Sequence, residues 1–233
     1  MASLFYCQEC RTEEQLDFNS TTSSGACRNC GGSSWREIDL TKKVIAIAGD
    51  TEFTCFDKIA GDVLDTGLVE ILEDFTLGRE FQVNSAPTSP KYFTEAAQKV
   101  HGISYFKAMT FPTRRESCIE IMKWLKFRID QFPLKFIYHG QGRLDHAWLQ
   151  EHFRKEDFQN SWYKVFPDHM VESTLKMARD NLKQIESHKL NELAKFYEIP
   201  LDNHHSALPD ARACAIIYCK LMNGEKVWTG QLI

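Results

Sequence analysis

Two carboxylates stand two residues apart at the end of an apolar run, in the stretch VIAIAGDTEF over residues 44–53. Alternate residues of a strand point to the same face, so Asp50 and Glu52 converge if this run is a strand. Burying two like charges is unfavourable unless a cation lies between them. The pair therefore indicates a site for a divalent cation, although Asp-x-Glu alone also occurs by chance.

Two further acids and a histidine stand at the starts of predicted helices. His205 precedes Asp210 by five residues, and Asp210 lies in the first turn of an otherwise apolar helix. Asp145 opens another helix, after an apolar strand that ends at His139-Gly140. The helix dipole also favours an acid at a helix start, so neither acid is diagnostic alone. Together these side chains have the chemistry of metal-assisted hydrolysis.

Four cysteines form a second candidate metal site. Cys7 and Cys10 make one Cys-x2-Cys pair, and Cys27 and Cys30 make another after sixteen intervening residues. This spacing is typical of one tetrahedral structural Zn²⁺, with an iron–sulfur centre as the alternative. The other cysteines are scattered as core thiols would be. Paired thiolate ligands favour a reducing compartment, so we expect an intracellular, cytoplasmic protein.

The apolar pattern predicts elements that place these residues. Strands are predicted over 44–53, 68–75, 78–84 and 134–140, with the second and third forming a hairpin beside the first. Helices are predicted over 90–100, 115–131, 144–154, 171–183, 188–197 and 207–222. Strands first, then strand and helix in alternation, predict an α/β fold with a mixed sheet flanked by helices.

Residues 1–40 have a different composition, with few large aliphatic residues and many Ser, Thr, Gly and Cys. Such a segment cannot bury a core of its own and would need a metal to fold. We therefore predict a small zinc-ribbon-like module over 1–40 and a main domain over 41–233. The ribbon could bind nucleic acid, bind protein or only stabilise the fold. Its three basic and six acidic residues are a poor composition for binding phosphates, so a protein partner is at least as well supported as nucleic acid.

Composition excludes several classes of protein. The chain has 233 residues, of which 43% are hydrophobic and 26% are charged, as in soluble globular domains. No window approaches the ~20 apolar residues of a membrane-spanning helix, and the opening residues do not resemble a secretion signal. The net charge of −4 excludes a globally basic surface. It does not exclude nucleic acid, because cleavage of phosphodiesters with bound cations requires carboxylates.

In their order along the chain, these motifs resemble the DEDDh family of 3′-to-5′ exonucleases, which includes RNase T and the proofreading exonucleases. Asp50-Thr-Glu52 matches the first motif, Asp145 the second and His205-x4-Asp210 the third. Two further stretches are similar to the family, VHGIS over 100–104 and HKLNELAKFYEIPLDNHHSALPDARACA over 188–215. The resemblance covers about residues 43–222. The loop before the second motif is one residue longer than usual, since His139 stands six residues ahead of Asp145.

The resemblance implies a ribonuclease H-like fold with a mixed five-stranded sheet flanked by helices. It also implies hydrolysis with two Mg²⁺ or Mn²⁺ ions, held by Asp50, Glu52, Asp145 and Asp210. Asp50 would bridge both ions, Glu52 and Asp210 would complete the site that activates water, and Asp145 would hold the second ion.

The general base implied by the resemblance is His205, which would take the proton from the attacking water. The adjacent His204 is the rival, but the five-residue offset to Asp210 favours His205. We assign no catalytic role to His101 or His139.

The substrate implied by the resemblance is the 3′ end of a single strand of nucleic acid. Its last nucleotide would lie at the backbone of Phe53 and Thr54, with Ile103 lining the same pocket and the Phe53 ring available for stacking. Phe53 could equally belong to the core. A set of basic residues could form a phosphate track or simply a solvated helix face: Arg114, Arg115, Lys123, Lys126 and Arg128.

Three functions remain open on the residues alone. The stretch Asp50-Thr-Glu-Phe-Thr-Cys55 looks more like the opening of exoribonucleases than the Asp-x-Glu-Thr-Thr-Gly of proofreading enzymes, which favours RNA. A DNA proofreading or repair exonuclease is the alternative, and an oligonucleotide comparison separates the two. A non-catalytic adaptor is a third possibility, against which the complete set of five active residues argues. The sequence predicts no oligomeric state.

Overall fold

A computed structural model describes residues 41–126, 128, 131–201 and 205–224, together with three short strands nearer the N-terminus. These are β1 (Ser3–Cys7), β2 (Glu13–Leu16) and β3 (Trp35–Ile38), which form an antiparallel sheet in the order β2-β1-β3. Cys7 ends β1, whereas Cys10, Cys27 and Cys30 lie outside the described residues. The zinc site and the division of the chain at residue 40 therefore stay predictions.

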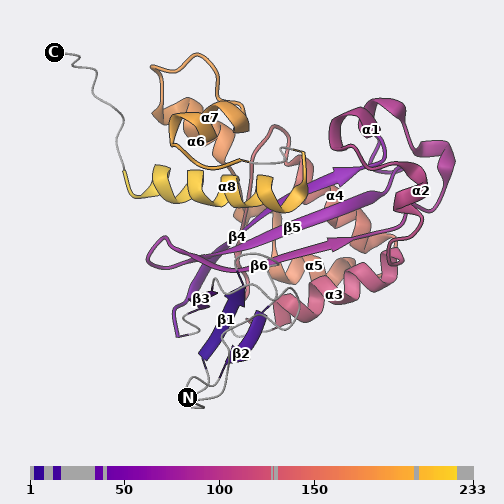
Figure 1. Cartoon of the computed structure of the whole chain (residues 1–233), viewed down its shortest axis with the longest axis horizontal. Helices are drawn as coiled ribbons and strands as arrows, with labels where there is room; N and C mark the ends of the chain where they lie inside the picture. Colours follow the sequence, from indigo (N-terminus) through magenta and orange to yellow (C-terminus); the bar gives the residue numbers. More distant parts are fainter. Residues whose placement is uncertain are drawn as a thin grey trace.

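The main sheet has five strands in the order β6-β5-β4-β7-β8 (Figure 1). The strands are β4 (Val44–Phe53), β5 (Val63–Leu72), β6 (Leu77–Asn84), β7 (Lys135–Tyr138) and β8 (Val171–Ser173). The first three pair antiparallel, as the hairpin prediction required, and β4-β7-β8 pair parallel. The predicted mixed five-stranded sheet is confirmed, and β4 is its central strand.

Helices cover both faces of this sheet (Figure 1). They are α1 (Glu95–His101), α2 (Tyr105–Ala108), α3 (Arg114–Lys126), α4 (Leu144–Arg154), α5 (Gln159–Val165), α6 (Thr174–Asn181), α7 (Leu190–Phe196) and α8 (Ala207–Met222). Ala46 and Ala48 of β4 belong to the core under α6, α7 and α8. Ile47, which points the other way, belongs to the core formed with α3, α4 and α5. The predicted α/β layers are confirmed.

Several predicted boundaries were wrong for local reasons. The helix predicted over 90–100 begins only at Glu95, because the Thr94 hydroxyl accepts from the Ala97 N–H and caps the helix there. The helix predicted over 115–131 ends at Lys126. The segment 171–183 begins with β8, which has three residues and is too short to show a strand pattern. The short helices α2 and α5 were not predicted.

Among the described residues, no helix combines the length and apolar character needed to cross a membrane.

Candidate active site

The end of β4 carries Asp50 and Glu52 on the face of the sheet that α8 covers. In the strand register Asp50 lies opposite Gly67 of β5. A Cβ atom at Gly67 would lie 2.4 Å from the backbone of Ala207, so a side chain there would push the first turn of α8 away. Glycine at this position therefore brings the start of α8 against the two carboxylates.

The start of α8 contributes Asp210 and the residue His205 just before the helix. The Asp210 side chain is buried, and its Oδ2 accepts a hydrogen bond from the His205 backbone N–H at 3.1 Å. His205 takes a left-handed backbone conformation with φ 72°, which is uncommon outside glycine and turns this N–H toward Asp210. Ligand atoms of Glu52, His205 and Asp210 all lie within 4.8 Å of one another. The imidazole itself is exposed.

Asp145 reaches the same place from α4. Its Oδ1 accepts hydrogen bonds from the Thr51 N–H at 3.1 Å and from the Thr51 hydroxyl at 3.0 Å. The longer loop before it does not displace it, because Gly142 and Arg143 both take left-handed conformations (φ 67° and 58°) and turn the chain into α4. The structure therefore brings Asp145 beside the strand that carries Asp50 and Glu52.

The four acids share one electrostatic environment. Burial, and then the charges of Asp145, Asp210 and Glu52, raise the pKa of Asp50 well above its ordinary value. Burial and the charge of Asp210 raise the pKa of Glu52 to about 8. Burial also raises the pKa of Asp145 to about 6, against the hydrogen bonds from Thr51, which lower it. Without a cation, the protein resists full ionisation of this cluster.

These donors fit a hard divalent cation. Carboxylate oxygens are the ligands that Mg²⁺ and Mn²⁺ prefer, and the imidazole near Glu52 and Asp210 adds a nitrogen that Mn²⁺ accepts. A bound cation would favour the ionised carboxylates that burial and mutual repulsion disfavour. The cluster therefore has both the donor set and the charge of a cation site.

The stability of the metal-free protein is expected to fall as pH rises from about 5 to 8. Glu52 releases its proton near pH 4.5 when unfolded but only near pH 8 when folded, and Asp145 shifts in the same direction. The folded state thus holds more protons in this window, and each excess proton lowers the free energy of unfolding by ~1.4 kcal/mol per pH unit. Thermal melting in chelator at several pH values measures this.

Two controls accompany that melting series. Glu52→Gln is expected to flatten the fall, whereas Glu120→Gln, an exposed acid on α3, should leave it unchanged. Saturating Mn²⁺ should raise the melting temperature most at the alkaline end. A melting temperature of the metal-free protein that rises between pH 5 and 8 would contradict the clustering of these charges.

A further buried acid beside the site, Asp65 of β5, was not predicted from the sequence. Its Oδ2 accepts a hydrogen bond from the Ala207 N–H at 3.2 Å, and the amides of Gln82 and Asn84 also donate to its carboxylate. Asp65 lies opposite Glu52 in the register and holds the N-terminus of α8 against the sheet. It is a positioning residue, and its contact across the fold leaves no sequence signal except an acid within a buried strand.

Of the three predicted substrate-binding residues, Phe53 and Ile103 are half-buried and Thr54 is fully buried. Phe53 is half-buried and stacks on Trp148, with ring centroids 4.6 Å apart and planes within 7°. Thr54 is fully buried: its N–H donates to the Asp62 carbonyl and its own carbonyl accepts from Thr94. Thr54 therefore helps to hold its loop together, and its contact with a 3′-hydroxyl stays a prediction. Ile103 is half-buried, and its N–H donates to His101 Nδ1 at 3.0 Å.

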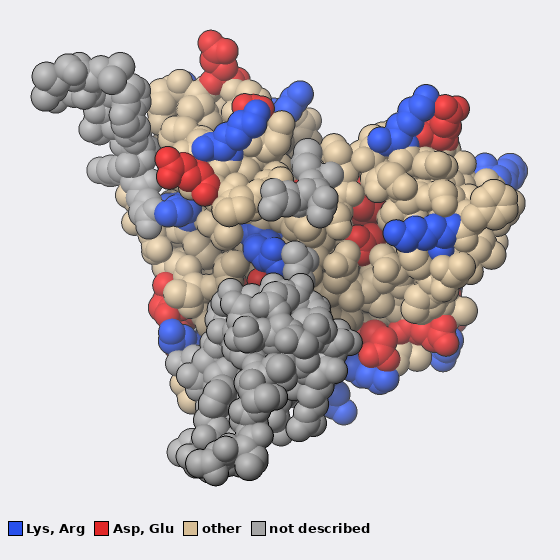
Figure 2. Space-filling model, viewed as in Figure 1, with Lys and Arg blue, Asp and Glu red and all other residues tan. Residues whose placement is uncertain are grey.

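Two of the five basic residues proposed as a phosphate track are held by buried acids. Arg114 binds the buried Asp62 carboxylate at 2.7 Å, and Arg128 is buried against Glu70. Lys123 pairs with Glu120 of the same helix. Charged side chains of both signs are interspersed over the described residues of the face in Figure 2. Arg115, Lys123 and Lys126 are exposed, so a phosphate track and a solvated helix face both stay open for these three.

The sheet order and the acids at the end of its central strand define an α/β nuclease of the ribonuclease H-like class. The sequence profile of the exonuclease family (RNase_T) matches residues 47–218. The chain belongs to this family of metal-dependent 3′-to-5′ exonucleases.

Two curated relatives match over short stretches, and both are DNA polymerase III of the PolC type. The protein from Caldanaerobacter subterraneus is 36% identical over 55 residues, which is 24% of this chain and 4% of the polymerase. That from Oceanobacillus iheyensis is 32% identical over 78 residues, 34% of this chain and 5% of the polymerase. The chain thus matches only a small part of these relatives.

Solved structures share the fold at low sequence identity. The complex of E. coli exonuclease I with single-stranded DNA has a TM-score of 0.65 at 15% identity, covering 79% of this chain and 41% of that one. The nuclease domain of 3′hExo, a DEDDh family member bound to rAMP, has a TM-score of 0.61 at 16% identity. The match covers 79% of this chain and 94% of that domain. The chain spans about two-fifths of exonuclease I.

Proposed function

We propose that this protein removes nucleotides one at a time from the 3′ end of single-stranded nucleic acid, with RNA as the favoured substrate. One observation carries the proposal: in a chain of the exonuclease family, Asp50, Glu52, Asp145 and Asp210 converge at the end of β4, and the exposed imidazole of His205 lies beside two of them. Carboxylates and a neighbouring general base are what metal-assisted hydrolysis of a phosphodiester requires.

The residues that would hold two Mg²⁺ or Mn²⁺ ions are the four acids. The charges of the other three acids all reach Asp50, and Asp50 would bridge the two ions. Glu52 and Asp210 would complete one site and Asp145 the other. When bound, such cations activate a water molecule and stabilise the leaving 3′ oxygen.

The protein's own proton acceptor in this proposal is His205. The imidazole is exposed, and one of its ring nitrogens lies within 4.8 Å of a carboxylate oxygen of Glu52 and of one of Asp210. A water molecule beside these acids is therefore within reach of the imidazole. The hydrogen bond from its backbone N–H to Asp210 fixes the position of its Cα atom. The imidazole would take the proton as the water oxygen bonds to phosphorus and the bond to the upstream 3′ oxygen breaks. The nucleotide leaves with a 5′-phosphate.

Aromatic side chains beside the end of β4 provide surfaces for unpaired bases. Phe56 is 74% exposed and contacts the edge of Phe53 at 5.8 Å between centroids. Phe106 is 84% exposed and contacts Tyr105 at 6.0 Å. Exposed rings bind bases by stacking, with little dependence on their identity, and a stacked base must be unpaired. These rings support a preference for single strands.

The choice between RNA and DNA follows from different observations. The motif Asp50-Thr-Glu-Phe-Thr-Cys55 favours RNA, and similar folds include a 3′-exonuclease that recognises the 3′ end of histone mRNA stem–loop. DNA is the second candidate, because the curated sequence matches are DNA polymerases. A protein distinguishes the two sugars through the 2′-hydroxyl.

A competition assay separates the two substrates. RNA and DNA strands of equal length and sequence, with different 5′ labels, are mixed with the enzyme and Mg²⁺ or Mn²⁺. The RNA strand is expected to shorten faster, in single-nucleotide steps from its 3′ end. Faster shortening of DNA would replace the RNA proposal by the DNA one, and cleavage of neither strand would favour the adaptor.

The N-terminal cysteines belong to a separate part of the proposal. Cys7, Cys10, Cys27 and Cys30 would bind one structural Zn²⁺ in a module over 1–40, preceding the exonuclease domain over 41–233 and offering a surface to a protein partner. Metal analysis of the purified chain is expected to find one zinc per chain, which is lost in Cys27→Ser. Absence of zinc in the wild type would contradict the module.

A further inference from the structure

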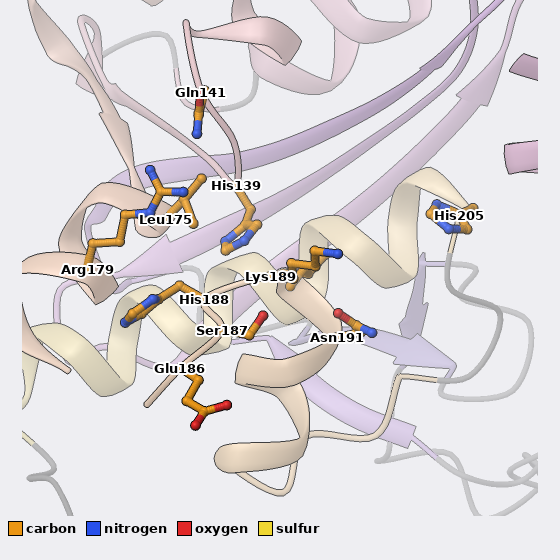
Figure 3. Close-up of a pocket in the computed structure, with 11 residues that line it drawn as sticks. His139, Gln141, Leu175, Arg179, Glu186, Ser187, His188, Lys189, Asn191 and His205 are labelled. Carbon is orange, nitrogen blue, oxygen red and sulfur yellow. The ribbon is translucent and has the colours of Figure 1, made fainter. Parts of the chain in front are cut away.

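A hollow lies beside the acidic centre, on the side of α6 and α7. It has a volume of about 770 Å³ and is bounded by the loop after β7, by α6 and by the segment leading into α7 (Figure 3). His205 lines the hollow, and one of its ring nitrogens lies within 4.8 Å of carboxylate oxygens of Glu52 and Asp210. The hollow is therefore next to the proposed reaction centre and shares a residue with it.

The lining of this hollow, which we call the Arg179 pocket, carries two positive side chains against one negative, together with several hydrogen-bonding groups. Arg179 comes from α6 and Lys189 directly precedes α7, while Glu186 supplies the single carboxylate among the described lining residues. The other polar lining residues are His139, Gln141, Ser187, His188, Asn191 and His205. The acidic centre attracts cations, whereas the adjoining Arg179 pocket suits an anion.

Hydrogen bonds hold several of these side chains in position. With its amide oxygen turned toward α6, Gln141 accepts from both terminal nitrogens of Arg179 at 3.2 Å. His139 Nδ1 lies 2.9 Å from the hydroxyl of the buried Thr174. Side chains that are already fixed lose less conformational entropy when a ligand binds. The Arg179 pocket is thus partly organised before any ligand arrives.

The chemistry of these groups points to phosphate. A guanidinium donates two parallel hydrogen bonds to phosphate oxygens, and an ammonium adds a point charge. The volume of the hollow lies in the ~300–1,000 Å³ range of small-molecule sites, which is enough for a phosphate with its attached sugar. We propose that the Arg179 pocket binds a phosphate group of the nucleic acid on which this enzyme acts.

This inference rests on the proposed function and adds a positioning site to it. The strand is a polyanion, and the carboxylates of the acidic centre repel it wherever cations do not neutralise them. Arg179 and Lys189 would attract one phosphate next to the reaction centre. That phosphate has two possible sources, the backbone of the bound strand or the 5′-phosphate of the released nucleotide, and kinetics distinguishes them.

The test compares wild type with the double variant Arg179→Gln, Lys189→Gln. KM and kcat are measured on single strands from two to about ten nucleotides long. A backbone-phosphate site predicts a KM about tenfold higher for the longer strands, little change for the dinucleotide and an unchanged kcat. The slope of log KM against log salt should fall by ~0.7 for one lost phosphate contact. A site for the released nucleotide instead predicts weaker inhibition by a nucleoside 5′-monophosphate.

The matched control is Lys176→Gln, Lys195→Gln, which removes two exposed lysines of α6 and α7 that lie outside the lining. Glu186→Gln is expected to have the opposite effect on KM. It removes the carboxylate from the lining and should lower KM about two- to threefold. Strand binding measured by fluorescence anisotropy in chelator repeats the comparison without hydrolysis.

The outcomes keep this inference separate from the proposed function. If wild type hydrolyses and the Arg179, Lys189 variant matches the control in KM, salt slope, product inhibition and binding, the Arg179 pocket is not a phosphate site. If wild type does not hydrolyse any strand, the proposed function fails, and the anisotropy comparison still decides whether the Arg179 pocket binds phosphate.

Discussion

Replacing Asp50 by asparagine is expected to lower the rate of strand hydrolysis by about 10³-fold or more while raising the stability of the metal-free protein. The rate falls because Asp50 stands among the other three acids and is the proposed bridge between two cations. Loss of several kcal/mol of transition-state stabilisation from misplaced cations corresponds to about this factor. The assay is single-turnover cleavage of a 5′-labelled strand at saturating Mn²⁺.

Stability is expected to move in the opposite direction for an electrostatic reason. Burial and four neighbouring carboxylates raise the pKa of Asp50, so its charge destabilises the metal-free fold. The neutral amide removes that charge at nearly constant volume. Relief of about 1–2 kcal/mol would raise the melting temperature in chelator at pH 8 by ~2–8 °C in a domain of this size.

Two outcomes of the Asp50→Asn experiment would contradict the prediction. If the variant keeps more than about a tenth of wild-type activity, Asp50 does not hold the cations. If its melting temperature in chelator falls, mutual repulsion of the acids is not the dominant effect there. Glu120→Gln, an exposed change on α3, is the matched control and should alter neither quantity.

Replacing His205 by alanine is expected to lower kcat by about 10²–10⁴-fold, the usual contribution of a general base. KM should change little, because His205 is proposed to act on the water. The wild-type rate should rise with pH through the range in which histidines titrate and then level off. That rise should disappear in the variant, and added imidazole should restore part of the rate.

His204→Ala is the matched control for this experiment. His204 lies outside the described residues, and sequence alone made it the rival base. If His204→Ala loses the activity and the pH dependence while His205→Ala keeps both, the two roles must be exchanged. Because His205 also lies near Glu52 and Asp210, weaker Mn²⁺ binding without loss of the pH dependence would make it a cation ligand and not a base.

The sequence was sufficient to place a site residue where that residue stands at the end of a strand or at the start of a helix. Asp50 and Glu52 were placed on one face by the alternation of a strand whose apolar residues are easy to recognise. Asp145 and Asp210 were placed in the first turns of α4 and α8. The longer loop before Asp145 did not affect this, since two left-handed residues take up the extra length.

Sequence was insufficient where a role depends on contacts between distant segments. The bond from Ala207 to Asp65 joins residues 142 positions apart, so Asp65 resembled an ordinary strand residue. The backbone of Thr54 closes a loop on Asp62 and Thr94, a structural role that the motif did not indicate. Arg128 belongs to a buried ion pair with Glu70 that no helical pattern reveals. Each miss has the same cause: the partner is known only once the chain is folded.

The most direct test of cation-dependent hydrolysis from the 3′ end is a time course on a 5′-labelled single strand with a free or a chemically blocked 3′ end. In Mg²⁺ or Mn²⁺ the free strand is expected to shorten in single-nucleotide steps, while chelator stops the reaction and the blocked strand stays intact. Internal cleavage of the blocked strand, or shortening that continues in chelator, would contradict the proposed function.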